Sequence, residues 1–310
     1  MAILVDAPRW PAHGTRFAHL VSDTSLNELH AFAAAAGLPD RAFDHDHYDI
    51  PERRHAELVA LGAQPVSEKE LLRRLRAAGL RVRPADRTPK PAQVLDGLRR
   101  AWQELLPAAP ELGEELLARW QEPHRSYHDV RHLAQALSAA EAVNHGALER
   151  PVRLALWFHD AVYDLRPGQD EEDSAVLAQQ RLAGLLPAAE VDEVARLVRL
   201  TASHDPDPGD AAGAVVMDAD LSILGQPAGR YHVYVRDIRT EYRAVPEEDF
   251  RRGRTQVLRS LLALDPLFRT AAGRRAWLAT AQQNLAEELK RWQVADSPLD
   301  SASKSRGEPS

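Results

Sequence analysis

Apolar residues recur at spacings of three and four along most of the chain beyond residue 92, and this periodicity predicts amphipathic helices. Eight segments show it clearly, namely residues 94–106, 111–120, 130–143, 152–163, 173–186, 191–204, 250–264 and 274–292. Prolines fall between these segments, where a helix can begin or end, at positions 107, 110, 123, 151, 187, 206, 227, 246 and 266. The pattern therefore predicts a mainly α fold with a helical bundle over roughly residues 92–294.

The first 84 residues show a different pattern, which predicts a small α/β domain. Short apolar runs of the kind found in buried strands occupy residues 2–5, 17–21 and 80–82. Two helices are predicted to start at polar capping segments and to end near the next glycine, namely from residues 23–25 to Gly37 and from residues 67–70 to Gly79.

A change in composition separates these two parts. The stretch RPADRTPKPAQ, residues 83–93, holds three prolines among alternating charges, which is typical of a linker. We therefore divide the chain into a domain at 1–84, a linker at 85–91 and a helical domain at 92–294. The remaining residues, 295–310, are polar and are predicted to form a disordered tail.

Composition narrows the classes of function that fit. The 310 residues carry a net charge of −7, which argues against a general nucleic-acid-binding surface. The chain has no cysteine, so disulfides and thiolate metal sites are excluded and any metal must be held by nitrogen and oxygen. The N-terminus does not resemble a secretory signal, and no window approaches the roughly 18 apolar residues of a membrane span. We expect a cytoplasmic protein without a membrane segment; its oligomeric state stays open.

Imidazole and carboxylate side chains interrupt the apolar pattern at four places in the helical part. These are His128 and His132 in YHDVRH, the adjacent pair His159 and Asp160 in WFHDAVYD, His204 in TASHD, and Asp218 and Asp220 in MDADLSILG. Such groups are costly to bury without a partner. They suit divalent metal ions, and helical bundles build metal sites from side chains on facing helices.

The order His132, then His159-Asp160, then Asp220 resembles the H…HD…D signature of the HD-domain superfamily of metal-dependent phosphohydrolases. A subgroup of predicted hydrolases with a YHxxxH motif is closer still. Its further motifs are matched by Glu171 with Ser174-Ala175, by Thr201 with His204, by DADLSILG, and by Tyr231 with Ile238, Arg239, Glu241 and Tyr242. Asp170 stands where the subgroup often has asparagine. The resemblance covers roughly residues 92–294.

This resemblance implies an HD-type bundle in which His132, His159, Asp160 and Asp220 bind a divalent metal (Mn²⁺, Mg²⁺, Fe²⁺, Co²⁺, Ni²⁺ or Zn²⁺). Two neutral imidazoles and two carboxylates neutralise such an ion and leave positions for water and a phosphate oxygen. The implied activity is hydrolysis of a small phosphorylated substrate, a phosphomonoester or phosphodiester such as a nucleotide. The alternative is a regulatory module that holds metal and nucleotide without turnover; the complete ligand set favours the enzyme.

Four further residues are candidates for catalytic roles, each beside a structural alternative. His128 precedes His132 by four residues, so on one helix both would share a face, and it is a ligand, a phosphate contact or a structural histidine. His204 is a phosphate contact, a ligand to a second metal or a helix C-terminal histidine. Glu171 is a proton shuttle or partner of a histidine, or a charge favoured at a helix N-terminus. Arg125 is a contact to an anionic substrate or a surface arginine.

Two aspartates near the signature have less direct roles. Asp164 is expected to contact a metal ligand and not the metal itself. Asp218 either orients a ligand or caps a helix.

The N-terminal domain carries a second group of polar residues. In FDHDHYD, His45 and His47 lie among three aspartates, which indicates either a second metal site or a polar turn. A pocket with this segment could include Asp6, Arg9, Trp10, His13 and His19, although WPAHG also has the composition of a structural loop. The stretches VDAPRWPAHG, HLVSDTSLNELHAFA and FDHDHYDIPE in the first 84 residues resemble a small uncharacterised bacterial domain, which implies no function.

Overall fold

The computed structural model describes residues 2–144 and 146–294, so the predicted tail at 295–310 lies outside the described residues. Contacts between residues divide the chain into two compact units. The first comprises the residues up to Pro89 together with Gln226–Asp237, and the second comprises Lys90–Gly225 and the residues from Ile238 onward. The boundary at Pro89 falls within the predicted linker. The prediction kept 226–237 in the helical domain, whereas its contacts place it with the first unit.

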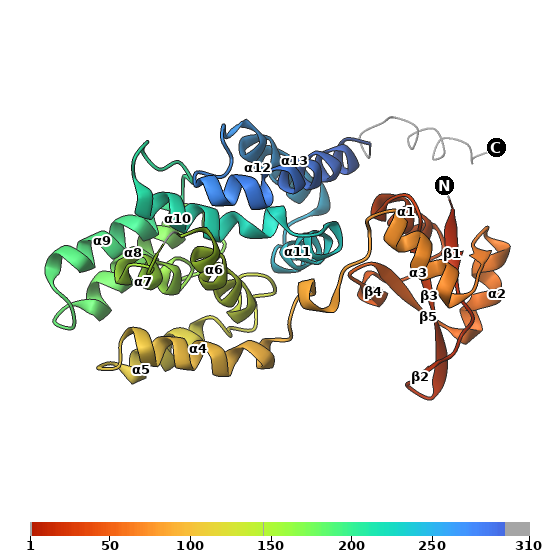
Figure 1. Cartoon of the computed structure of the whole chain (residues 1–310), viewed down its shortest axis with the longest axis horizontal. Helices are drawn as coiled ribbons and strands as arrows, with labels where there is room; N and C mark the ends of the chain where they lie inside the picture. The colour runs from red at the N-terminus through yellow and green to blue at the C-terminus, as the bar shows by residue number, and fades with distance from the viewer. Residues whose placement is uncertain (1, 145, 295–310) are drawn as a thin grey trace, which may run out of the picture. The chain divides into compact units, whose positions relative to one another are not determined.

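The first unit is built on a mixed β-sheet, with strand order β4-β5-β3-β1-β6 and with β2 paired to β3 (Figure 1). All the pairs are antiparallel except β1 with β6. The strands are β1 (Ile3–Val5), β2 (Trp10–Ala12), β3 (Thr15–Ser22), β4 (Phe43–Asp44), β5 (His47–Pro51) and β6 (Gln64–Pro65). The helical elements of this unit are α1 (Leu26–Ala35), η1 (Asp40–Ala42), α2 (Glu52–Ala60), α3 (Glu68–Ala77) and η2 (Pro84–Asp86).

Helices cover both faces of this sheet. Successive residues of a strand point to opposite sides, and apolar residues on each side pack against a helix. On one face, Leu20 of β3 and Ile50 of β5 pack with apolar residues of α1 and α2. On the other face, Leu4 and Val21 pack with Leu71 and Leu75 of α3. The structure confirms the predicted small α/β domain at this end of the chain.

The predicted helix starts in this unit are confirmed by their caps. The Ser25 hydroxyl accepts a hydrogen bond from the Glu28 N–H at the start of α1, and Ser67 does the same for Glu70 at α3. The predicted strand at 80–82 is wrong. The Val82 N–H donates to the Asp46 carboxylate at 2.8 Å, so this backbone group is satisfied by a side chain and not by a neighbouring strand.

The second unit is helical throughout the part that the structure describes. Its elements are α4 (Pro91–Leu105), α5 (Pro110–Arg119), α6 (Val130–Val143), α7 (Arg150–Phe158), α8 (Gln169–Leu182), α9 (Ala188–Leu200), α10 (Ala211–Asp220), η3 (Leu221–Gly225), α12 (Glu247–Ala263) and α13 (Ala271–Val294). The helix α11 (Ala228–Glu241) ends in this unit and begins in the first.

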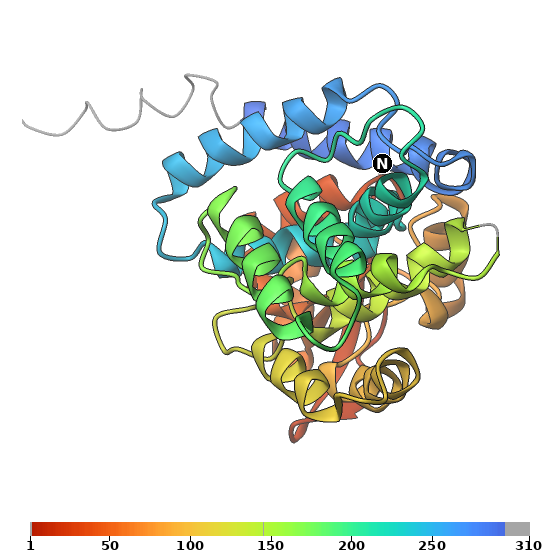
Figure 2. The ribbon, with the colours of Figure 1, turned by 90° about the vertical axis from the view of Figure 1, so that its left-hand side faces the viewer.

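One continuous apolar core runs through α4 to α10. The helix α10 packs on α6, α7 and α9, and α8 packs along α9. The helices α12 and α13 lie side by side, as both views show (Figures 1 and 2). This packing brings the ends of α6, α7 and α10, which carry the signature residues, into one region.

Two predicted helices end earlier than their apolar periodicity suggested. The helix predicted over 152–163 ends at Phe158, so His159 is its C-cap and Asp160 lies in the following turn. The helix predicted over 191–204 ends at Leu200, and His204 has a φ of 53°, in the left-handed region. In both places the polar residues lie just beyond the helix. No helix among residues 2–144 and 146–294 is both long and apolar enough to cross a membrane.

Candidate metal centre

Two histidines and an aspartate from three helices meet in the core of the helical unit. His132 projects from α6, His159 caps α7 and Asp220 ends α10. The Nε2 atoms of the two histidines are 3.0 Å apart, and Asp220 Oδ1 is 3.2 Å from His132 Nε2 and 3.6 Å from His159 Nε2. Every donor atom of this trio lies within 4.8 Å of the others.

Asp160 lies beside the same two imidazoles. Its Oδ2 is 3.2 Å from His159 Nε2 and 3.7 Å from His132 Nε2. The four residues of the signature are therefore gathered around the two facing Nε2 atoms.

The geometry and chemistry of these donors fit a divalent cation. Donor atoms about 2.1 Å from one ion lie about 3 Å apart at right angles and about 3.4 Å apart at tetrahedral angles, close to the spacings found. The Nδ1 of His159 lies 2.8 Å from the Leu156 carbonyl and must donate to it, which turns the Nε2 lone pair toward the cluster. His132 differs, since its buried Nδ1 has no hydrogen-bond partner in the described part of the chain.

Electrostatics also favour positive charge at this point. Burial opposes ionisation, yet the neighbouring Asp160 carboxylate raises the pKa of His159 well above its usual value. Burial likewise opposes the carboxylate form of Asp220, but its histidine neighbours lower its pKa well below the usual range. For His132, burial prevails and lowers the pKa. Two carboxylates thus favour one cationic charge between them, which a proton on His159 or a metal ion supplies.

His128 was predicted to share a helix face with His132, and this is wrong because α6 begins only at Val130. It nevertheless lies close, with ring centroids 5.6 Å apart. Its Nδ1 lies 2.8 Å from the Glu241 carboxylate. Burial disfavours the imidazolium, but the Glu241 charge outweighs it and raises the pKa of His128.

Glu241 anchors the loop before α6, a role that the sequence did not reveal. Its Oε1 accepts three consecutive backbone N–H groups, from Ser126, Tyr127 and His128, at 2.7 to 2.9 Å. The Tyr163 hydroxyl donates to the other oxygen at 2.9 Å. Only the resemblance of Ile238, Arg239, Glu241 and Tyr242 to a motif of the hydrolase subgroup pointed at this residue, since a single glutamate at the end of a polar helix gives no other signal.

Arg125 does not face an open site. Its buried guanidinium donates to the backbone carbonyls of His128, Asp160 and Ala161 and to the Glu122 carboxylate. These contacts occupy its five N–H groups. The structure therefore gives Arg125 a positioning role, holding the His128 loop against the turn that carries Asp160, in place of the predicted contact to an anionic substrate.

His204 contacts the cluster directly. Its Nε2 is 3.0 Å from Asp220 Oδ2, the oxygen that does not face His132. Because a carboxylate can only accept, His204 Nε2 must carry the proton. This hydrogen bond fixes the orientation of Asp220.

The other candidates lie in helix caps and turns. Glu171 accepts the Gly168 N–H at 2.6 Å as part of the α8 capping box, so its geometry supports the alternative of a helix N-terminal charge. Asp218 accepts the N–H groups of Arg269 and Thr270 and the Thr270 hydroxyl just before α13, whose first turn is capped by Thr270 through the Gly273 N–H. Asp164 is exposed and pairs with Arg166.

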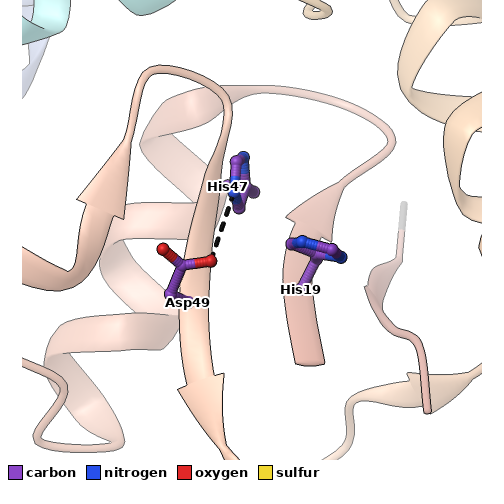
Figure 3. A group of neighbouring side chains, drawn as sticks. All are labelled: His19, His47 and Asp49. Carbon is purple, nitrogen blue, oxygen red and sulfur yellow. Dashed lines mark ion pairs between the residues drawn. The ribbon is translucent and has the colours of Figure 1, made fainter. Parts of the chain in front are cut away.

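A second trio of possible ligands lies in the N-terminal unit, where His19, His47 and Asp49 come together (Figure 3). His47 Nε2 is 3.4 Å from Asp49 Oδ1, and all three donor atoms lie within 4.8 Å of one another. Of the two histidines predicted in FDHDHYD, His45 is placed elsewhere. Its Nδ1 pairs with Asp44 and its Nε2 accepts the Thr88 N–H, so both nitrogens are used.

A cavity of about 810 Å³ opens beside this second trio. It is lined by four of the five residues proposed for a pocket here, namely Asp6, Trp10, His13 and His19, but not by Arg9.

The model of a family described as proteins of unknown function, DUF4031, matches residues 3–78. No curated protein and no solved structure matches the chain. The DUF4031 match covers about a quarter of the chain and includes His19, His47 and Asp49. It ends before His132, so it does not bear on the cluster in the helical unit.

Proposed function

We propose that the helical unit is a metal-dependent phosphohydrolase of the HD-domain superfamily, acting on a phosphomonoester or phosphodiester such as that of a nucleotide. The convergence of His132, His159, Asp160 and Asp220 carries this proposal. Residues separated by up to 88 positions in sequence meet in the order and with the ligand chemistry of the H…HD…D signature. Burying four such groups together has a physical reason if they share a cation.

The four ligands would hold Mn²⁺, Fe²⁺, Co²⁺, Ni²⁺, Zn²⁺ or Mg²⁺. Such an ion supplies activation of a water molecule and neutralisation of charge on a phosphoryl group. The protein's own contribution is to fix the ligands. The Leu156 carbonyl sets the tautomer of His159, His204 orients Asp220, and Arg125 holds the turn that presents Asp160.

His128 is the residue best placed to act on substrate. Its Nδ1 is committed to Glu241, which leaves Nε2 available, and it lies beside the ring of His132. As an imidazolium it would donate a hydrogen bond to a phosphoryl oxygen or protonate a leaving group. Glu171 and Arg125, which make other contacts, have no catalytic part in this proposal.

The test is hydrolysis of phosphomonoesters, phosphodiesters and nucleotides by the full chain with Mn²⁺, Mg²⁺, Co²⁺ or Ni²⁺. Asp160→Ala removes one ligand and is expected to reduce turnover on the order of 100-fold or more. Asp164→Ala is the matched control, since it removes an exposed aspartate four residues further along without touching the cluster. Equal rates in wild type and Asp160→Ala would contradict catalysis at this site. Metal binding that depends on Asp160 without any turnover would favour the binding module.

A further inference from the structure

The strand register explains why His19, His47 and Asp49 lie on the same face of the N-terminal sheet. In β3 and β5, Leu20 and Ile50 point into the core beneath α1 and α2, so the alternate residues His19, His47 and Asp49 point to the opposite face. His19 and Asp49 are directly opposed across the antiparallel pair, and the ring centroids of His19 and His47 are 4.9 Å apart. Figure 3 shows the three side chains on these neighbouring strands.

A buried carboxylate backs each of the two histidines. His19 Nδ1 lies 2.9 Å from Asp6, and His47 Nδ1 lies 2.7 Å from Asp46. Asp6 is 2% exposed and Asp46 is fully buried. This carboxylate–histidine arrangement fixes the ring and leaves Nε2 as the outward nitrogen, as in the histidine ligands of metal sites.

The backing carboxylates are themselves held rigidly. Asp6 accepts the His19 backbone N–H at 2.6 Å, while Asp46 accepts the Val82 N–H and pairs with Arg81. A histidine that served only to pair with a buried aspartate would need no further partner. Here each pair also offers a ring nitrogen within 4.8 Å of the other and of a carboxylate oxygen of a third residue, Asp49.

The trio faces the cavity of about 810 Å³, so three protein ligands would leave coordination positions open. Open positions of this kind distinguish catalytic from structural metal sites. The three ligands supply one negative charge through Asp49, and the Asp6 and Asp46 carboxylates behind the two rings add further negative charge, of which Arg81 balances that of Asp46. Arg41 lines the same cavity and has no ion-pair partner among the described residues, so it offers a guanidinium to an anion that enters the cavity. An anionic oxygen ligand at the open positions would pair with this guanidinium.

We propose that His19, His47 and Asp49 form a second divalent-metal site, of the type that binds Zn²⁺, whose open positions take a small oxyanion from the cavity. It is separate from the centre at His132, and neither proposal depends on the other.

The first measurement is the number of Zn²⁺ ions bound per full-length chain. His47→Gln is expected to lose one ion relative to wild type, whatever number the helical unit binds. Asp49→Asn changes a side chain that is 47% exposed, so it should fold normally while binding this ion at least tenfold more weakly. His13→Asn is the matched control, because it removes another histidine of the cavity wall at a position with φ 48°, which asparagine tolerates.

Circular dichroism and thermal melting identify any variant that fails to fold. If correctly folded Asp49→Asn and His47→Gln bind as many Zn²⁺ ions, with the same affinity, as wild type, the site does not exist.

The second measurement tests the oxyanion. Subtracting the visible spectrum of Co²⁺-loaded His47→Gln from that of the loaded wild type isolates the N-terminal site. Millimolar inorganic phosphate should change this difference spectrum, and Arg41→Ala should raise the phosphate concentration required. A difference spectrum indifferent to phosphate would overturn the proposed anionic ligand.

Discussion

Replacing Glu241 probes the loop that presents His128 to the cluster. The carboxylate is buried, accepts three backbone N–H groups and the Tyr163 hydroxyl, and pairs with His128. Glu241→Ala leaves all of these donors without their acceptor. Glu241→Gln keeps the shape and one carbonyl oxygen, so the backbone N–H groups can remain bonded while the negative charge is lost.

The pKa of Glu241 sets the size of the effect. Burial alone would raise this pKa, but His128 and the backbone donors hold it at about 2, against an ordinary value of 4.5. That difference corresponds to about 3 kcal/mol of stability. An independent comparison agrees, because removing one partner of a buried charged network costs about 3 to 5 kcal/mol. We expect Glu241→Ala to lose about 3 to 5 kcal/mol and Glu241→Gln about half as much.

The same shift fixes the pH dependence. A carboxylate whose pKa is lower in the folded state stabilises the fold fully above the unfolded value of 4.5 and loses that effect as the pH falls toward 2. Glu241→Gln has no such group. Its stability deficit should therefore be largest at neutral pH and shrink below about pH 4.

Tryptophan fluorescence during urea unfolding can follow this unit. Five of the six tryptophans lie in the helical unit, at positions 102, 120, 157, 277 and 292, and the sixth is Trp10. Glu248→Ala, at an exposed position of α12, is the control and should change stability by less than about 0.5 kcal/mol. If Glu241→Ala is as stable as this control at neutral pH, the loop is not held as described.

Three further substitutions or treatments test other contacts. Arg125→Met should cost about 2 to 4 kcal/mol in urea unfolding, because three backbone carbonyls lose their donor, and Arg125→Lys should not restore it since an ammonium lacks the guanidinium fork. Asp218→Ala should cost about 1 to 2 kcal/mol because two backbone N–H groups and the Thr270 hydroxyl just before α13 lose their acceptor, yet it should leave the bound-metal count unchanged, although Asp218 is only two residues from Asp220. Saturating Mn²⁺ should stabilise the wild-type helical unit by about 3 kcal/mol at one hundred times the dissociation constant, and His159→Ala should abolish this gain.

Much of the helical unit could be predicted from its sequence because its helices bury one apolar stripe each. The ends of the helices were harder. The three- and four-residue periodicity continues to His159 and His204, but the helices end at Phe158 and Leu200. A residue that fits the periodicity of a helix therefore need not be part of it. The strands β2, β4 and β6 are only two or three residues long, too short to show an alternation, and they were missed.

The candidate centre was predictable as a set, but the supporting contacts were not. Motif order identified His132, His159, Asp160 and Asp220, which the fold brings together. The partners that hold them are backbone carbonyls and distant side chains, such as Leu156 and Glu241, and these leave no local pattern. Arg125 illustrates the difference, because a sequence shows its charge but not that its five N–H groups are already engaged.

The two candidate centres differ in their ligand sets, and this predicts different chemistry for each. The helical set joins two imidazoles to two carboxylates, so a divalent ion would be neutralised by the protein, and its oxygen donors suit Mn²⁺ and Mg²⁺ as well as softer ions. The N-terminal set has only Asp49 as an anionic ligand, with both imidazoles fixed by buried carboxylates, which favours Zn²⁺, Co²⁺ or Ni²⁺ over Mg²⁺. In these two proposals both sites take phosphate, but with different partners. In the helical unit His128 would receive the phosphoryl group beside the ion, whereas in the N-terminal unit the anion would bind at the open positions of the ion and pair with Arg41.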